Sequence, residues 1–196
     1  MQRRALQELV DIQAGYPFRG RLPLSASGDA WVVQFRHIVV GARLNDSAGA
    51  GLDRAQLTGR KRPNFLQPGD VLFMAKGTRN DAAAVGDVPA NTVCTPNFYH
   101  LRLKPGVRDI TPDFLAWQLN HRQAQQYFAA CCQGSVALSI TKSQLARLPV
   151  GIPALDTQRQ IAKLASAAFE EEQLLYKLIH NRKRQLTALG DRLLNP

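Results

Sequence analysis

Short apolar runs separated by turn residues dominate the first half of the chain. Runs rich in β-branched and aromatic residues predict strands, and the Gly, Pro, Asp and Asn residues between them predict turns. A helical turn that runs into a strand is expected at 6–12. Further strands are expected at 31–35, 38–40, 71–74, 82–85 and 98–103.

Helical spacing replaces this pattern after residue 110. The run Thr-Pro-Asp at 111–113 predicts a helix start, because a hydroxyl caps free amides, Pro suits the first helical position and an acid favours the first turn. Apolar residues keep helical spacing beyond this start, which predicts that the helix continues until it ends near Gly134. Thr141 with Gln144 predicts a short capped helix, and 150–153 an extended exit from the domain.

One long helix is predicted over 157–194. This stretch holds no Pro and a single Gly, Gly190, and Thr157 with Gln160 matches a capping box. At 1.5 Å per residue the helix is roughly 57 Å long. Alternating steps of four and three residues define a coiled-coil seam with one acidic and one basic interruption. The seam is Ile161, Ala165, Ala168, Glu172, Leu175, Ile179, Arg182, Leu186, Leu189 and Leu193.

These patterns predict an α+β protein. Residues 1–155 form a globular domain with a mixed sheet and short helices, and one long C-terminal coiled-coil helix follows over 157–194. Hydrophobic residues make up 45% of the chain and charged residues 20%, which is typical of soluble globular proteins.

The chain is strongly basic. Its formal net charge is +10, and residues 1 to 110 hold fifteen Lys and Arg against nine Asp and Glu. A positive potential of this size attracts polyanions, of which nucleic acid is the first candidate. The alternative explanation of the positive charge is that the genome favours Arg and that the surface is simply well solvated.

Cysteine usage and hydropathy indicate a cytoplasmic protein. Cys131 and Cys132 are adjacent and Cys94 stands apart, so no repeated metal-ligand spacing exists, and no secretory leader precedes the charged start. No apolar run approaches the roughly 18 residues of a membrane span, so no transmembrane role is expected.

Candidate DNA contacts lie on basic residues near predicted turns and strand ends. The segment 41–63 loses periodicity and is expected to be an exposed basic loop, and the turn after 71–74 has a basic tip. Arg and Lys fix a protein on phosphates, while a few Arg, Asn or Gln side chains reach base edges. The candidates are Arg19, Arg21, Arg36, Arg43, Arg60, Lys61, Arg62, Lys76, Arg79 and Asn80.

The sequence shows no assembled catalytic site, so neither a metal nor a cofactor is expected. An amino-methyltransferase needs an Asn/Asp-Pro-Pro-aromatic motif, which 95–98 lacks, and the Gly-rich run 49–51 has neither a preceding strand nor a following helix. Asp70 and Asp87 with Lys76 could hold a metal for phosphate cleavage. The simpler interpretation makes Asp70 a turn former after Pro and Gly.

Several short motifs stand out by their order and spacing. They are 9–12 with Gly15 and Phe18, 68–73 with Gly77 and Asn80, 114–119, Gly134 with Ser135, and 148–153 with Leu155, Gln158 and Ile161. Together they resemble the specificity subunit of type I restriction and modification systems, in which target recognition domains alternate with long helices. The resemblance implies DNA binding without catalysis.

Family members usually carry two recognition domains and two helices, whereas this chain has room for one of each. It therefore resembles half a specificity subunit. Either two copies of the chain pair with each other, or the chain works differently from the other family members. We expect a homodimer joined by antiparallel helices. The alternative is that the apolar stripe packs on a partner enzyme or back on its own domain.

We expect the chain to bind double-stranded DNA sequence-specifically and to direct a methyltransferase, with a restriction subunit as a further partner. Two other interpretations remain open. A stand-alone DNA-modifying or DNA-cleaving enzyme would cut or modify DNA alone, and an RNA-binding protein would prefer single strands.

Overall fold

The computed structural model describes residues 2–46, 49, 51–59, 61–77, 79–132 and 138–194. The predicted DNA contact Arg60 and the motif residues Gly134 and Ser135 lie outside the described residues.

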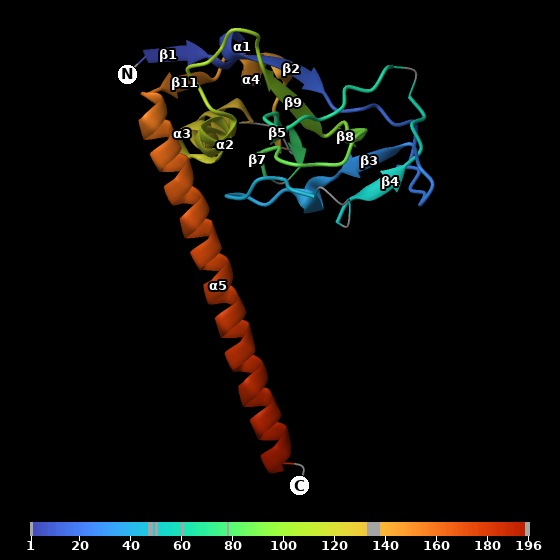
Figure 1. Ribbon diagram of the computed structural model, residues 1–196, viewed down its shortest axis with the longest axis vertical. Coiled ribbons are helices and arrows are strands. Elements are labelled where there is room, and N and C mark those ends of the chain that lie inside the picture. Colours follow the sequence, from blue (N-terminus) through green and yellow to red (C-terminus); the bar gives the residue numbers. More distant parts are fainter. Residues whose placement is uncertain are drawn as a thin grey trace.

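Strands and short helices precede one long helix (Figure 1). The elements are β1 (Gln2–Ala5), α1 (Leu6–Leu9), β2 (Val10–Ala14), β3 (Ala30–Val33), the 3-10 turn η1 (Phe35–His37), β4 (Asp53–Ala55), β5 (Val71–Met74), β6 (Lys76–Gly77), β7 (Ala82–Ala84), β8 (Thr92–Cys94), β9 (Phe98–Leu103), α2 (Pro112–Asn120), α3 (Arg122–Cys131), β10 (Leu138–Ser139), α4 (Lys142–Ala146), β11 (Pro149–Ile152) and α5 (Leu155–Leu194).

The central sheet is antiparallel, with strand order β2-β9-β5-β7. A smaller sheet has the order β4-β3-β8, in which β3 and β8 run parallel. Two further pairs, β1 with β11 and β6 with β10, join distant parts of the chain. The predicted mixed sheet and long C-terminal helix are confirmed.

Both faces of the central sheet are buried, so strand β5 is apolar throughout. Val71 and Phe73 pack in the core beneath α2 and α3, whereas Leu72 and Met74 pack in the core on the side of β3 and β8. The ring of Phe73 lies 4.9 Å from that of Phe128 on α3. The globular part of the chain is thus layered, with helices on one face of the central sheet and the small sheet on the other.

Several sequence predictions are confirmed and others need correction. Residues 38–40 form no strand, because the chain leaves β3 at Val33 and enters the turn η1. The helix predicted from 111 to 134 is two helices, since His121 is extended, with ψ of 149°, and caps α3. The segment 41–63 is not simply a loop, because β4 pairs with β3 and buries Ala55.

The long helix begins at Leu155, two residues earlier than predicted, so Thr157 lies inside its first turn and does not cap it. The extended exit before it is strand β11, which pairs with β1. Gln158 is fully buried and anchors the helix to the domain. Its Nε2 donates to the carbonyls of Asp109 at 2.7 Å and Pro153 at 2.9 Å, and its Oε1 accepts from the amide of Thr111 at 2.9 Å.

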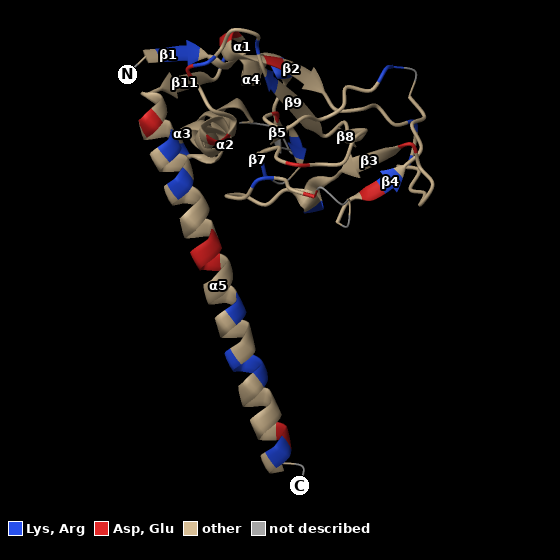
Figure 2. Cartoon of the chain, in the orientation of Figure 1, with Lys and Arg blue, Asp and Glu red and all other residues tan. Residues whose placement is uncertain are grey.

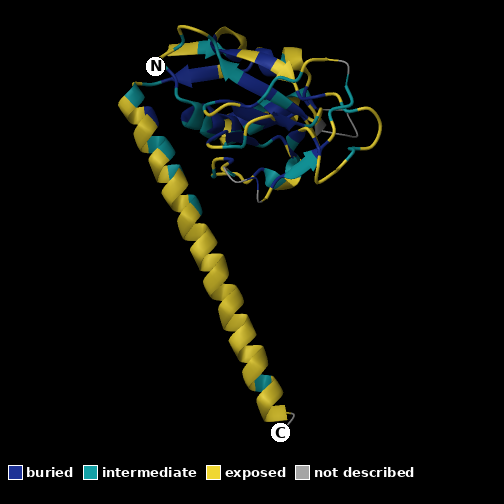
Figure 3. Ribbon diagram, turned by 45° about the vertical axis from the view of Figure 1, so that its right-hand side comes forward, coloured by how far each residue is buried: buried dark blue, intermediate teal, exposed yellow. Residues whose placement is uncertain are grey.

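Helix α5 leaves the domain after about four turns and then runs alone (Figure 3). Ile161 packs against the core of the domain, so this seam position is covered by its own chain. Beyond it, large apolar side chains stand exposed, among them Leu175, Ile179, Leu186, Leu189 and Leu193. No helix in the described part of the chain is long and apolar enough to cross a membrane.

Candidate nucleic-acid interface

Two loops that carry predicted DNA contacts are fastened to each other. The hydroxyl of Tyr16 accepts from the amide of Gly59 at 2.7 Å and donates to its carbonyl at 3.0 Å, and the amide of Arg19 donates to Thr58 at 3.2 Å. A Cβ at Gly59 would lie 2.9 Å from the Tyr16 ring, so only glycine fits there. We call residues 16–22, 57–59 and 61–66 the paired basic loops.

The paired basic loops share a small apolar core and leave their cations in solvent. Tyr16, Phe18, Leu57 and Phe65 pack together against the small sheet. The exposed basic side chains that these loops carry are Arg19, Arg21, Lys61 and Arg62. Figure 2 shows Lys and Arg on the loops beyond β3, β4 and β8, on the side of the domain away from α5.

A buried polar network lies beneath these loops. Arg102 donates to Asp70 from Nε at 2.7 Å and from Nη2 at 2.8 Å, and its Nη2 also donates to the carbonyl of Phe65 at 3.0 Å. Nε2 of His100 lies 2.7 Å from the same carboxylate. The amide of Asn64 reaches Nδ1 of His100 at 3.0 Å. The network therefore ties the loop 64–67 to strand β9.

The carboxylate of Asp70 is kept ionised by this network. Burial alone raises its pKa, but the hydrogen bonds from Arg102 and His100 outweigh burial and hold the pKa below its ordinary value. Asp70 also accepts from the amide of Gln67 at 2.7 Å. It is therefore a turn former and an anchor, and among the described residues no group of three His, Cys, Asp or Glu could hold a metal.

The remaining candidates lie elsewhere on the domain. Arg36 pairs with Asp53, and Arg79 pairs with Asp81 at 2.7 Å, so both cations have acidic neighbours. Lys76 is exposed on β6.

Arg43 and Asn80 differ most from the prediction that they contact DNA. Arg43 pairs with Asp113 at the start of α2, beside α5. Asn80 is buried, and its Nδ2 donates to the carbonyl of Met74 at 3.0 Å. A side chain that is buried in the fold cannot reach a base edge, so Asn80 is not a DNA contact in this structure.

Sequence reasoning missed the residues that position the loops. The sequence patterns did not single out Tyr16, Asn64, His100 or Arg102 as candidates. One signal existed, because His100 and Arg102 alternate with apolar residues along β9 and therefore share one face. Such alternation ordinarily indicates a face in contact with water, so the sequence shows that His100 and Arg102 lie together but not that they meet a buried carboxylate.

The fold is that of type I specificity subunits. The S subunit of the type I restriction-modification system from M. genitalium aligns with a TM-score of 0.58 at 17% identity, over 93% of this chain and 42% of that chain. The HsdS subunit from Thermoanaerobacter tengcongensis aligns with a TM-score of 0.63 at 17% identity, over 99% and 44%.

A third structure, described as the basis of complex assembly and conformational transition of the type I R-M system, aligns with a TM-score of 0.68 at 16% identity, over 99% and 44%. The chain therefore spans less than half the length of these solved chains. No curated protein matches it significantly in sequence.

The sequence itself matches the family model described as the type I restriction modification DNA specificity domain over residues 4–180. The chain belongs to this family. Membership confirms the resemblance noted in the sequence, and it agrees with the prediction that the chain recognises DNA and is not an enzyme.

Proposed function

We propose that this chain is a DNA-specificity half-subunit. It binds double-stranded DNA sequence-specifically through residues 1–155 and directs a modification methyltransferase, with a restriction subunit as a further partner. The observation that carries this proposal is the pair of basic loops, joined by hydrogen bonds at one side of a domain that belongs to a DNA specificity family. A defined arrangement of cations fixes the register on phosphates, which base readout requires.

We further propose that two copies pair through antiparallel α5 helices over residues 157–194. The proposal is supported by the exposed stripe on α5, which would leave a large apolar surface in water.

A twofold axis near Lys177 gives a specific register. It sets Leu175 against Ile179, Ala168 against Leu186 and Ala165 against Leu189, so small side chains meet large ones in two layers. Ile161, already packed on its own domain, marks the end of the seam and comes opposite Leu193.

The same register places the two polar interruptions together. Glu172 of each copy comes opposite Arg182 of the other, so the opposite charges compensate each other and disfavour other registers. Such a dimer is isologous and carries its two recognition domains at opposite ends, which implies a target with two inverted halves.

Selection of bound sequences from a random duplex library tests this function. The expected result is one motif with two inverted halves at fixed spacing. A pool without a common motif would contradict sequence-specific recognition. Cleavage or methylation of DNA by the purified chain alone would favour a stand-alone enzyme instead.

A further inference from the structure

The turn η1, which follows β3, is anchored to the core on both sides of Arg36. The ring of Phe35 lies 5.3 Å from that of Phe98 and packs against the core between the two sheets. Ile38, at the end of the turn, is buried in the same core. The side chain of Arg36 is nevertheless 61% exposed. A backbone fixed by buried neighbours therefore carries this cation at the surface.

The guanidinium of Arg36 is held along one of its edges. Its Nη2 donates to Oδ2 of Asp53 on β4, and its Nε lies 3.0 Å from Nε2 of His37. Burial, together with the positive charge of Arg36, lowers the pKa of His37, so the ring is neutral at neutral pH. The same oxygen of Asp53 accepts from Nε2 of Gln34, which directly follows β3. Because β3 and β4 pair, two neighbouring strands fix the position of the carboxylate.

The other edge of this guanidinium is open. Nη1 and Nη2 present two parallel N–H groups there, and within the described part of the chain no hydrogen bond engages Nη1. Two parallel donors match O6 and N7 of guanine, which are neighbouring acceptors in the major groove of DNA. A phosphate can accept from Arg in the same bidentate way. Asp53 disfavours a phosphate at this place, because its negative charge compensates that of Arg36 and would repel the phosphate oxygens.

We propose that Arg36 reads a guanine in the major groove of the DNA target, and that Asp53 and Gln34 are positioning residues that orient its guanidinium. This inference rests on the proposed DNA-specificity function and names one base and the side chain that reads it. Because the donors are oriented before DNA binds, Arg36 loses less conformational freedom when it meets the base. The paired basic loops then supply phosphate contacts, and η1 supplies base readout.

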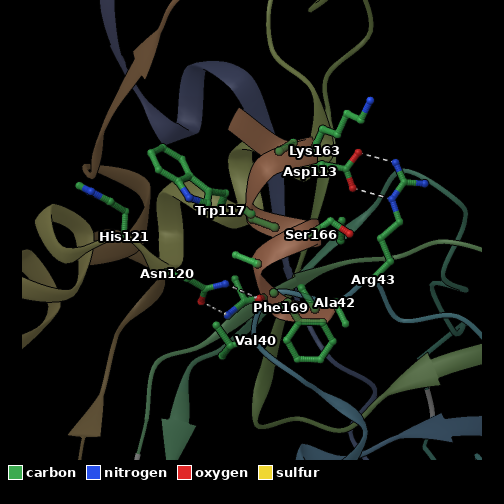
Figure 4. Close-up of a pocket in the computed structure, with 18 of the residues that line it drawn as sticks. Val40, Ala42, Arg43, Asp113, Trp117, Asn120, His121, Lys163, Ser166 and Phe169 are labelled. Atoms are coloured by element: carbon green, nitrogen blue, oxygen red, sulfur yellow. Dashed lines mark hydrogen bonds and ion pairs between the residues drawn. The ribbon is translucent and has the colours of Figure 1, made fainter. Parts of the chain in front are cut away.

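The ion pair of Arg43 with Asp113 has similar chemistry but a different setting. Arg43 donates through Nε and Nη2 to the two oxygens of Asp113. Figure 4 shows this pair in the wall of a groove of about 930 Å³ between the domain and the proximal part of α5, where Lys163 also lines the groove. The Arg43 pair therefore faces a helix of its own chain. Arg36 lies outside the groove lining and is open to solvent.

Duplex selection with Arg36→Lys tests the assignment. Lysine keeps the positive charge but lacks the pair of parallel donors. We expect the wild type to require a G·C pair at one position of its motif where the variant accepts other base pairs. In competition at fixed salt, replacing this pair by A·T should weaken wild-type binding roughly 5- to 150-fold and binding of the variant less than about threefold. Arg184→Lys, on the distal part of α5, is the matched control and should select the wild-type motif.

Asp53→Asn distinguishes a positioning role from a purely structural one. Without the carboxylate the guanidinium of Arg36 is no longer oriented, so discrimination at the same G·C pair should fall at least about threefold. At the same time the uncompensated charge of Arg36 should strengthen binding to a scrambled duplex and steepen the salt slope by up to about 0.9, the value for one added phosphate contact. A residue that only stabilised the fold would weaken binding to both duplexes alike.

Several outcomes would overturn the proposal. If the wild type and Arg36→Lys select the same motif, Arg36 reads no base, and this inference fails while the proposed function stands. If Arg36→Ala weakens binding to selected and scrambled duplexes equally and makes the salt slope shallower, Arg36 holds a phosphate. If Asp53→Asn changes neither the base preference nor the salt slope, Asp53 does not position Arg36. A wild type that selects no motif removes the proposed function and this inference together.

Discussion

Asp70→Asn tests whether the buried network holds the paired basic loops on the sheet. The side chain of Asp70 is 3% exposed, and it meets Arg102 and His100 at 2.7 Å each. Breaking one side of a buried ion pair costs about 3–5 kcal/mol. Because Arg102 is 34% exposed and water can recover part of its solvation, we expect the lower end of that range, about 3 kcal/mol.

The loss should be visible in thermal and urea unfolding. For a chain of this size about 3 kcal/mol corresponds to a fall in Tm of roughly 6–12 °C. Asp11→Asn removes an exposed carboxylate from the neighbouring strand β2 and should change Tm by less than about 1 °C. Equal Tm values for the two variants would refute the assignment of Asp70 as an anchor.

The pH dependence gives a second readout of the same residue. The folded-state pKa of Asp70 lies below its unfolded value of about 3.9, so its contribution is complete above that value and is lost as pH falls through the folded pKa. The difference in unfolding free energy between the wild type and Asp70→Asn should therefore be constant near neutral pH and shrink below about pH 4. A difference that grows on acidification would contradict a depressed pKa.

Three further predictions concern DNA and assembly. Four phosphate contacts per domain, one from each exposed cation of the paired basic loops, give a salt slope of about −3.6 and about 100-fold weaker binding between 50 and 200 mM salt; binding that is flat over this range would contradict phosphate anchoring. Replacing Arg60, Lys61 and Arg62 together with Ala should weaken duplex binding at least tenfold in fluorescence anisotropy and leave Tm unchanged. Arg182→Glu should weaken the dimer in sedimentation, and adding Glu172→Arg should restore it in part.

Matched controls separate these effects from net charge. Arg184→Ala removes a cation from the distal helix and should reduce duplex binding far less than the loop variant. Glu171→Arg, next to the seam but outside it, should not rescue Arg182→Glu. Rescue by both substitutions would mean that net charge, and not the register, controls assembly.

Local signals in the sequence predicted the elements that depend on a few neighbouring residues. Thr111 caps α2 by accepting from the amide of Phe114, and Thr141 forms its capping box with Gln144, as expected. These interactions span three residues, so the sequence contains all of the information. The same holds for α5, whose length follows from an uninterrupted helical pattern.

Features that depend on distant residues escaped prediction. Apolar spacing continues across His121, so the break between α2 and α3 leaves no trace in periodicity. Asn80 follows a turn and looks like a surface residue in the sequence. In the structure it is buried, and its amide donates a hydrogen bond to the carbonyl of Met74. The pairing of the basic loops rests on Tyr16 and Gly59, forty-three positions apart.

Sequence-specific recognition means that the chain distinguishes one duplex sequence from others. Its most direct test is an equilibrium competition, at fixed salt, between the duplex obtained by selection and a scrambled duplex of equal length and composition. We predict that the selected duplex binds at least about 1,000-fold more tightly, as specific DNA-binding proteins do. A ratio below about tenfold, with both duplexes bound, would mean that the domain holds DNA only by its charge and would contradict its role as a specificity subunit.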